Sequence, residues 1–414
     1  MKDKIAVIGL GYVGYPLAKR LATKYTVIGY DKNEEKIEKL QLKNQTIHFS
    51  TNNMCLEEAN IYIIAVPTPI NPTDKTPNLS FLLQASKEVG AHLHKNDLVI
   101  YESTVFPGTT EKICIPILLQ QSGLKKEEIY VGYSPERINP GDRKHNLIRT
   151  TKLISSNSYK GLKKIKSIYN YLTNNNTYTC NSIKEAEAAK LLENVQRDVN
   201  IALMNEFSVL CSALNISFNN ILNAAQTKWN FSSYYPGLVG GHCIGVDPYY
   251  LIEGAKKINV DMNLPTKARE VNENMVALII DKVNHWLTLN SLDHVLVLGC
   301  TFKPNIDDIR NSKPLYIAEQ LTRRYDYKVS IFDPFLTKNK INVLNDLSTI
   351  PALINNNDAI LLLSPHQILL NQLEKTYSKS SWLNATNNKF VIDPYGCLNK
   401  LFKTDFHKNY YSLI

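Results

Sequence analysis

The first part of the chain contains the pattern that most constrains its fold. An apolar run with strand character at 5–8 leads into Gly9-Leu-Gly-Tyr-Val-Gly14, and a helical spacing of apolar residues follows. A second apolar run then ends in Asp31, 20 residues after Gly11. Strand, G-x-G-x-x-G, helix, strand and acid in this order predict a dinucleotide-binding βαβ unit, which the glycines alone would not do.

This spacing gives each residue a physical role. Gly9 makes the tight turn, Gly11 lets the backbone approach the pyrophosphate, and Gly14 allows the helix to pack closely on the strand. The helix N-terminus supplies unpaired N–H groups for the phosphate. The Asp31 carboxylate can accept hydrogen bonds from ribose hydroxyls and would repel a 2′-phosphate, which favours NAD over NADP. The alternative is a glycine turn that binds no ligand.

Length and composition indicate a multidomain globular protein. With 414 residues, of which 44% are hydrophobic and 21% charged, two or three domains are expected. No apolar run reaches 18 residues, and the charged N-terminus leads directly into a strand. We therefore expect no membrane helix and no signal peptide. Seven cysteines without a C-x-x-C pair favour a reducing compartment, and hence the cytoplasm.

The positive charge is moderate and scattered. The formal net charge is +9, with one local cluster at 160–166. This cluster is typical of a solvated helix face, although a positive field also suits an anionic nucleotide. The dense mixture of basic and aromatic residues that marks a nucleic-acid module is missing from the sequence, so no nucleic-acid partner is expected.

Apolar runs and helical patterns divide the chain into three parts. The first and last parts alternate strands with helices, which predicts parallel sheets. The middle part contains helical patterns at 182–214 and 265–289, the first without Gly or Pro for more than 30 residues. A loop with four prolines spans 67–78. The expected strands after the first two lie at 61–66, 98–101, 129–133, 152–155, 294–299, 328–333, 358–364 and 389–393.

We therefore predict an α/β protein with two Rossmann-like, doubly wound parallel-sheet domains. A central helical domain with a long spine helix joins them and is expected to mediate subunit contacts. The predicted boundaries are 1–181 for the dinucleotide-binding domain, 182–290 for the helical domain and 291–414 for the last domain. Because the strand at 294–299 is not followed by G-x-G-x-x-G, we expect the last domain to hold a different nucleotide.

A glycine-rich loop in the middle part presents one cysteine, Cys243. Four of the chain's 17 glycines fall within nine residues there: Gly237, Gly240, Gly241 and Gly245. Such a backbone turns sharply or approaches something closely, and a thiolate held on it can attack a substrate carbon. A buried, inert cysteine is the structural alternative. Metal binding by His242 and Cys243 is another, but no second pair completes a zinc spacing.

NAD and a nucleophilic cysteine together predict a four-electron oxidation. An alcohol that loses a hydride becomes an aldehyde, to which the thiolate of Cys243 can add. The resulting thiohemiacetal loses a second hydride and becomes a thioester, which water cleaves to a carboxylate. A two-electron alcohol dehydrogenase has no use for the cysteine.

Polar residues on the spine helix and at strand ends could serve this reaction. Lys190, Asn194 and Arg197 share one helix face, which in most proteins is simply solvated. Glu136 follows one expected strand, where ligands of α/β sheets bind. Asp247 would disfavour the thiolate if it lay close, so a cation such as Lys190 would be needed nearby. Packing positions are expected on the same helix at Ala186, Ala189, Leu192, Val195 and Val199.

The motifs taken together resemble those of the UDP-glucose/UDP-N-acetylhexosamine 6-dehydrogenase family. The resemblance covers nearly the whole chain, and it implies a dinucleotide domain, a helical dimerisation core and a UDP-binding domain. It rests on these segments, in order: Gly9-Leu-Gly-Tyr-Val-Gly14, Glu102-Ser-Thr-Val-Phe-Pro-Gly-Thr109, Ser134-Pro-Glu-Arg137, Lys190-Leu-Leu-Glu-Asn194, Gly240-Gly-His-Cys-Ile-Gly-Val-Asp-Pro-Tyr-Tyr250 and Phe302-Lys-Pro-Asn-Ile-Asp-Asp-Ile-Arg310.

The resemblance also implies roles for individual residues. Cys243 would be the nucleophile, Lys190 and Asn194 would stabilise the oxyanion, and Glu136 would be the general base for thioester hydrolysis. Asp247 and Thr104 would position the catalytic water. The cofactor would contact Gly9, Gly11, Tyr12, Val13, Gly14, Asp31, Pro67, Thr68, Ser103, Thr104 and, at its pyrophosphate, Arg310. The substrate would contact Glu136, Arg137, Lys190, Asn194, Arg269 and Lys303, and Lys228 is a further candidate.

One position departs from the family pattern, and one motif narrows the substrate. Ile306 stands where the family usually has Thr, which puts a minor cofactor contact in doubt. The run from His242 to Tyr250 is more similar to the N-acetylhexosamine branch than to the UDP-glucose branch. We therefore expect a homodimeric 6-dehydrogenase of UDP-GlcNAc or UDP-GalNAc in surface polysaccharide synthesis. UDP-glucose or UDP-N-acetylmannosamine oxidation, a two-electron hydroxyacid dehydrogenase and a non-enzymatic NAD-binding regulator are the alternatives.

Overall fold

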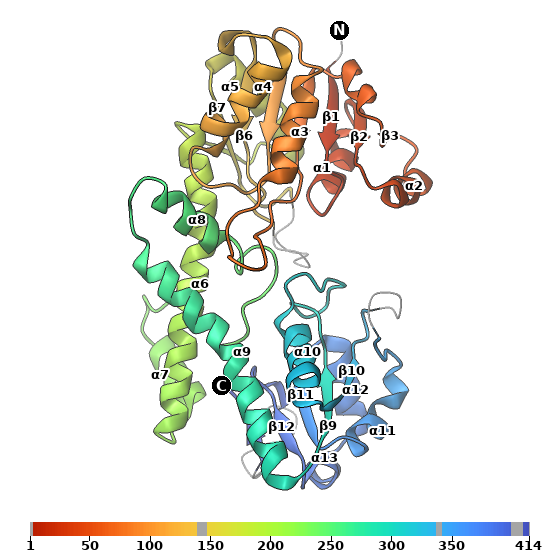
Figure 1. The fold of residues 1–414 in the computed structure, drawn as a ribbon, viewed down its shortest axis with the longest axis vertical. Helices are drawn as coiled ribbons and strands as arrows, with labels where there is room; N and C mark the ends of the chain where they lie inside the picture. Colours follow the sequence, from red (N-terminus) through yellow and green to blue (C-terminus); the bar gives the residue numbers. More distant parts are fainter. Residues whose placement is uncertain (1–2, 139–146, 337–341, 399–408, 414) are drawn as a thin grey trace. The chain divides into compact units, whose positions relative to one another are not determined.

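The computed structural model describes residues 3–138, 147–336, 342–398 and 409–413. The chain divides into two compact units, and each contains one sheet with helices packed against it (Figure 1). The first unit comprises Met1–Glu193 and Tyr249–Met262, and the second comprises Asn194–Pro248 and Asn263–Ile414. Among the described residues, no helix combines the length and the apolar character needed to cross a membrane.

The sheet of the first unit has eight strands in the order β3-β2-β1-β4-β5-β6-β7-β8. All neighbours are parallel except β6 and β7, where Gly132 pairs with Ser156 in antiparallel register. The strands are β1 (Lys4–Ile8), β2 (Thr26–Tyr30), β3 (His48–Ser50), β4 (Ile61–Ile64), β5 (Leu98–Tyr101), β6 (Tyr130–Tyr133), β7 (Lys152–Ser156) and β8 (Thr177–Thr179).

The antiparallel direction of β7 differs from the prediction, which was an entirely parallel sheet. A parallel neighbour needs a crossover connection, usually a helix. The described parts of the connection from β6 to β7 contain no helix. An apolar run predicts that a strand forms but does not encode its direction.

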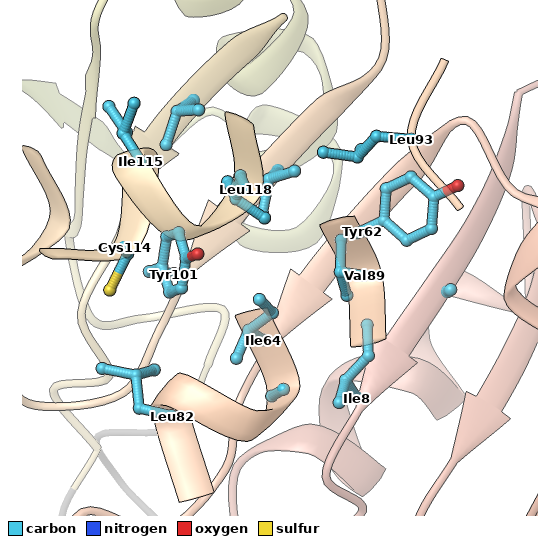
Figure 2. Packing of buried hydrophobic residues seen from close by; sticks show 14 of the residues in the cluster. Ile8, Tyr62, Ile64, Leu82, Val89, Leu93, Tyr101, Cys114, Ile115 and Leu118 are labelled. Carbon is cyan, nitrogen blue, oxygen red and sulfur yellow. The ribbon is translucent and has the colours of Figure 1, made fainter. Parts of the chain in front are cut away.

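Alternate residues of the first sheet face two separate apolar cores. Ala6 and Ile8 of β1 pack into one core, whereas Ile5 and Val7 pack into the other. Figure 2 shows the first core, where Leu82 and other side chains from the covering helices meet the strand residues. The helical segments up to residue 173 are α1 (Gly14–Leu21), α2 (Glu34–Lys43), η1 (Asn53–Glu58), α3 (Ser80–Gly90), η2 (Thr110–Cys114), α4 (Ile115–Ser122), η3 (Lys126–Glu128) and α5 (Tyr159–Thr173).

Two long helices occupy the middle of the sequence, close to their predicted bounds. They are α6 (Ile183–Ala213) and α9 (Asn263–Asn290), and the shorter α7 (Phe218–Gln226) and α8 (Asp247–Lys256) lie between them in the chain. Ala186 and Val195 of α6 are buried as predicted, but Leu192 is 67% exposed. The prediction that Leu192 packs against other parts of the chain is therefore wrong. Helical spacing alone does not show which apolar residues of a helix are buried by neighbouring elements.

The sheet of the second unit is entirely parallel, in the order β10-β9-β11-β12-β13. Val295 and Val297 of β9 face one core, whereas Leu296 and Leu298 face the other. The predicted α/β class is therefore confirmed for both sheets. The elements are β9 (His294–Leu298), α10 (Lys313–Tyr325), β10 (Lys328–Phe332), η4 (Leu347–Thr349), α11 (Ile350–Asn355), β11 (Ala359–Leu362), α12 (Gln367–Thr376), α13 (Lys379–Thr386), β12 (Phe390–Ile392) and β13 (Tyr410–Tyr411).

Candidate active site

The loop between β1 and α1 has the shape that a dinucleotide requires. Gly9 adopts a φ of +88°, and a Cβ there would lie 2.8 Å from the carbonyl oxygen of Ala65. A Cβ on Gly14 would lie only 1.9 Å from the carbonyl oxygen of Gly9. A Cβ on Gly11 would meet nothing within 4 Å, so the space beside this backbone is open where the fingerprint places a pyrophosphate. These residues therefore fit NAD.

Asp31 ends β2 beside this loop, and its carboxylate is already hydrogen-bonded. Its Oδ2 accepts from the backbone N–H of Leu10 at 2.8 Å and from Nζ of Lys36 at 2.7 Å, and its Oδ1 accepts from the N–H of Asn33. The bond from Leu10 ties the acid to the glycine loop. Lys36 was not anticipated from the sequence, and it partly offsets the negative charge that Asp31 presents to a ribose.

The strand order places the glycine loop at a topological switch point. The sheet order reverses between β1 and β4, and ligands of open α/β sheets bind outside the strand ends at such a point. Thr68 follows β4, and Ser103 and Thr104 follow β5. Ser103 donates a hydrogen bond from Oγ to the carbonyl of Val66 at 2.6 Å, which holds these two loops together. The other expected cofactor contacts on nearby loops lie at Tyr12, which is exposed, Val13, which is partly buried, and Pro67, which is exposed.

Glu136 belongs to a buried cluster of charges at the ends of β5, β6 and β7. Nζ of Lys152 lies 2.5 Å from Oε2 of Glu102 and 3.1 Å from Oε2 of Glu136, and Tyr169 donates to Glu102. Burial raises the pKa of Glu102, despite the opposing charge of Lys152. Burial also opposes ionisation of Glu136, but the Lys152 charge and hydrogen bonds from Lys152 and from the backbone N–H groups of Arg137 and Ile138 together outweigh it and lower the pKa of Glu136. These interactions together keep Glu136 in the carboxylate form, which is the form a general base needs.

Lys190 and Asn194 do not lie on a solvated helix face. Each is 7% exposed, whereas Arg197 is exposed, so the three residues of the predicted stripe have different surroundings. The solvated-face alternative is therefore wrong for Lys190 and Asn194. Nearby in the sequence, Arg137 pairs with Glu193 at 2.6 Å and donates to the carbonyl of Thr151, so its guanidinium is held within the first unit.

Within the second unit, Asn194 lies with the residues of the cysteine loop. Asn194 donates from Nδ2 to Oδ2 of Asp247 at 2.6 Å, and both side chains are buried. The backbone N–H of Asp247 donates to the carbonyl of Cys243 at 2.8 Å. Three residues that the sequence analysis assigned to the reaction are thus joined through hydrogen bonds, and the amide of Asn194 is oriented by the acid.

The glycines of this loop allow it to pack against the loop after β9. A Cβ on Gly240 would lie 2.6 Å from the carbonyl oxygen of Asn311, and one on Gly241 would lie 2.6 Å from the ring of Phe302. Nδ2 of Asn311 also donates to the carbonyl of Gly241, and the backbone carbonyl of Asn311 accepts a hydrogen bond from the N–H of Gly241. Close approach of two backbones therefore explains the glycine content. It brings His242 against the second loop.

His242 lies between Cys243 and Asp308. Its Nδ1 is 3.3 Å from Sγ of Cys243, and its Nε2 is 3.7 Å from Oδ2 of Asp308. Burial by itself would lower the pKa of His242, but the interactions with Asp308 and Cys243 outweigh it and raise the pKa to about 9. Asp308 also accepts from Nε and Nη2 of Arg310.

The other residues expected to contact ligands have varied surroundings. Lys303 is partly buried and Lys228 is exposed. Ile306, which departs from the family pattern, is buried. Arg269 is buried, where it donates to Oδ1 of Asp198 at 2.7 Å and to Glu273. Their contacts with cofactor or substrate remain predictions.

The loop after β9 in the second sheet resembles the glycine loop after β1, but the aspartate beside it is buried and already paired. Gly299 has a φ of +78°, and Oδ2 of Asp333 accepts from the N–H of Cys300 at 2.7 Å, as Asp31 does from Leu10. Asp333 is fully buried, however, and its carboxylate lies 2.9 Å from Nε2 of His366. It is therefore not available to a ribose, which agrees with the missing glycine fingerprint.

Two further residues, one in each unit, were missed from the sequence. His242 was considered only as a metal ligand, although its position beside the cysteine was a usable signal. Lys152 begins a strand 16 residues after Glu136 in the sequence, and no local spacing links them. Only the pairing of β6 with β7 brings the lysine to the carboxylate.

Three family models match consecutive parts of the chain. The NAD-binding domain of the UDP-glucose/GDP-mannose dehydrogenase family matches residues 41–173, its central domain matches 184–274, and its UDP-binding domain matches 296–400. A model of coenzyme F420-dependent NADP oxidoreductases matches residues 4–73. The chain therefore belongs to the UDP-glucose/GDP-mannose dehydrogenase family, and its cofactor is NAD.

Similar proteins narrow the substrate class. Protein CapL of Staphylococcus aureus is 40% identical over 96% of this chain and 97% of its own length. UDP-N-acetyl-D-glucosamine 6-dehydrogenase of Salmonella typhi is 43% identical over 82% and 84%. The solved structure of a UDP-D-ManNAc dehydrogenase from Pyrococcus horikoshii has a TM-score of 0.86 at 29% identity and covers 99% of both chains. The chain is thus a nucleotide-sugar 6-dehydrogenase of the UDP-N-acetylhexosamine type.

Proposed function

We propose that this protein oxidises the C6 hydroxyl of UDP-GlcNAc or UDP-GalNAc to a carboxylate, in two steps that share one active site. The observation that carries this proposal is the set of hydrogen bonds that joins Asn194 of α6, Asp247 at the start of α8 and Cys243 of the glycine-rich loop. NAD, when bound, accepts one hydride in each oxidation step. A cysteine is needed only if the aldehyde is oxidised further, so its placement supports a four-electron reaction.

The residues of the chain would act on the aldehyde in sequence. The thiolate of Cys243 adds to the aldehyde carbon, and the charge moves to the carbonyl oxygen. Lys190 and Asn194 stabilise this oxyanion, and the bond from Asn194 to Asp247 fixes the direction of the amide. Loss of the second hydride leaves a thioester on the cysteine.

Hydrolysis of the thioester would require a base and a positioned water. Glu136 takes the proton of the water, and contacts with Lys152 and with two backbone N–H groups keep this carboxylate ionised. Asp247 and Thr104 position the water. Arg137, Arg269, Lys303 and the less firmly supported Lys228 are proposed to hold the UDP-sugar, and Arg310 the pyrophosphate of NAD.

UDP-N-acetylmannosamine is the second candidate substrate, because a UDP-N-acetyl-D-mannosamine dehydrogenase of Methanococcus aeolicus is 34% identical over 96% of this chain. UDP-glucose is a third. The experiment is a panel of UDP-sugars with NAD, in which NADH formation is measured for each. We expect UDP-GlcNAc or UDP-GalNAc to give the highest kcat/KM. A higher value for UDP-ManNAc or UDP-glucose would reassign the substrate.

The domains, the subunit assembly and the cellular role of the protein follow from the same family membership as proposals. We propose an NAD-binding domain at 1–181, a helical dimerisation domain at 182–290 and a UDP-sugar-binding domain at 291–414. The protein would act as a homodimer in the cytoplasm and supply a uronate for capsule or O-antigen synthesis. An apolar stripe along α6 and the residue that follows it supports dimerisation, because Leu203, Phe207 and Leu210 of α6 and then Leu214 recur at helical spacing and are all exposed.

A further inference from the structure

We propose that His242 is a catalytic residue that takes the proton of the Cys243 thiol and then stabilises the thiolate as an imidazolium. This inference rests on the proposed function, because it assumes that Cys243 is the nucleophile. From the sequence, Lys190 was the expected activating cation. The structure provides one in direct contact with the sulfur.

The geometry is that of a nucleophile, a base and an orienting acid. Nδ1 of His242 lies 3.3 Å from Sγ of Cys243, within reach of a proton transfer. On the other side of the ring, Nε2 lies 3.7 Å from Oδ2 of Asp308. The Sγ–H bond breaks, the proton and Nδ1 form a new bond, and the neutral pair becomes a thiolate and an imidazolium. No electrons leave the pair in this step.

The surroundings of His242 favour this ion pair. The ring is partly buried and meets the ring of Phe302 edge-on, with 5.6 Å between centroids. The acidic group that faces the ring is Asp308, and the nearby basic group is Arg310. The guanidinium of Arg310 donates hydrogen bonds to the same Asp308 carboxylate. The pKa of His242, raised to about 9, indicates that the imidazolium persists at neutral pH.

The glycines keep His242 in this position. The packing of Gly240 and Gly241 against Asn311 and Phe302 fixes the backbone on the N-terminal side of the histidine. On the C-terminal side, the N–H of Asp247 is bonded to the carbonyl of Cys243. The imidazole and the thiol are therefore held together by the loop itself.

The test is the alkylation rate of Cys243 by iodoacetamide as a function of pH. Trypsin releases Cys243 in the peptide 229–256, where it is the sole cysteine, so mass spectrometry reports on this thiol alone. With the ion pair, the rate in the parent protein at pH 6.5 should stay within about threefold of its rate at pH 10. For an ordinary thiol with a pKa of about 8.5, the alkylation rate at pH 6.5 would be roughly 100-fold lower than at pH 10.

The variant His242→Gln should show the ordinary profile, with a loss of tenfold or more at pH 6.5 and little change at pH 10. His285→Gln, an exposed histidine on α9, is the matched control and should behave like the parent. Buried Cys211 and Cys300 must stay unlabelled, which shows that the second unit is folded. A parent rate that falls like that of an ordinary thiol would overturn the proposal even if the variant did not fold.

The outcome also separates this inference from the proposed function. Uronate formation by Cys243→Ala is measured in parallel. If that variant is inactive while His242→Gln has the parent's alkylation profile, Cys243 remains the nucleophile and the role of His242 is wrong. If Cys243→Ala makes uronate at the parent's rate, the proposed function itself is wrong.

Discussion

At the scale of single residues, the seven cysteines differ in their surroundings. Cys114 lies in the apolar core of the first unit, where burial raises the pKa of its thiol to about 12 (Figure 2). Burial likewise raises the pKa of Cys300 well above its ordinary value. Such thiols are inert at neutral pH. Cys243 is partly buried and has a histidine beside it.

This contrast predicts the effect of replacing Cys243. Serine offers a neutral hydroxyl at neutral pH, so Cys243→Ser should bind both ligands, release almost no uronate and retain any slowly formed sugar ester. Cys243→Ala should bind both ligands and form no adduct. Intact-protein mass spectrometry after incubation with NAD and UDP-sugar distinguishes them. The control Cys55→Ser should be nearly as active as the parent. If Cys243→Ala formed uronate at the parent's rate, Cys243 would not be the nucleophile.

Asp31 gives a second prediction at this scale. Its carboxylate is bonded to the N–H of Leu10 and to Lys36, so Asp31→Ala should both loosen the glycine loop and leave Lys36 free to attract a 2′-phosphate. We expect kcat/KM for NAD to fall and the ratio of NAD to NADP use to narrow by tenfold or more. Steady-state kinetics with both cofactors measures this ratio. A parent enzyme that uses NADP as well as NAD would show that Asp31 does not discriminate.

Single residues also show where sequence reasoning was sufficient. The positions of the glycine fingerprint and Asp31 in the fold, and the close backbone approach at the cysteine loop, could be predicted because each depends on neighbours within one short segment. Their contacts with ligands remain predictions. Lys152 and Asp308 could not, because each meets its partner only after distant segments pack. A lysine in a strand and an aspartate in a loop have no local spacing that indicates an ion pair.

At the scale of elements, a carboxylate on α6 holds the start of another helical segment. Glu187 accepts hydrogen bonds from the backbone N–H groups of Gly108 and Thr110, which precede and begin η2. This is the position in which a helix N-terminus binds an anion. Glu187 is fully buried, and burial raises its pKa to about 7 even though these hydrogen bonds oppose the shift.

This shift predicts a pH dependence of stability. A carboxyl whose pKa rises on folding stabilises the fold fully below its unfolded pKa of 4.5, and that stability is lost as the pH rises through about 7. The difference corresponds to about 3 kcal/mol. In Glu187→Gln this titration is missing, so the parent's Tm relative to the variant's should fall by several degrees between pH 4.5 and pH 8. Calorimetry measures both curves, and parallel curves would contradict the assignment.

Elements were predicted well where apolar periodicity was strong. The bounds of α6 and α9 were within two residues of those observed, because long helices have many turns over which the pattern repeats. The antiparallel direction of β7 and the existence of β13 were not predicted. Direction depends on the connection, and a two-residue strand is too short for any alternation to be recognised.

At the scale of the whole molecule, the apolar stripe on α6 predicts a dimer. Leu203, Phe207, Leu210 and Leu214 are spaced by four, three and four residues. Leu210→Glu would place a charge in the middle of an interface, so it should reduce the mass in light scattering from twice 47.0 kDa to 47.0 kDa. Leu42→Glu, at an isolated exposed leucine on α2, is the control and should remain dimeric. A monomeric parent protein would contradict the proposed dimer.

We propose that one protein performs two successive oxidations of the same carbon, the second of them through Cys243. The most direct measurement is the number of NADH molecules formed per molecule of UDP-N-acetylhexosamine, with the sugar limiting and NAD in excess. Because the thiohemiacetal permits a second hydride loss, we predict two NADH and a uronate product. One NADH for each sugar, with the aldehyde as the product, would contradict the claim and remove Cys243 from the reaction.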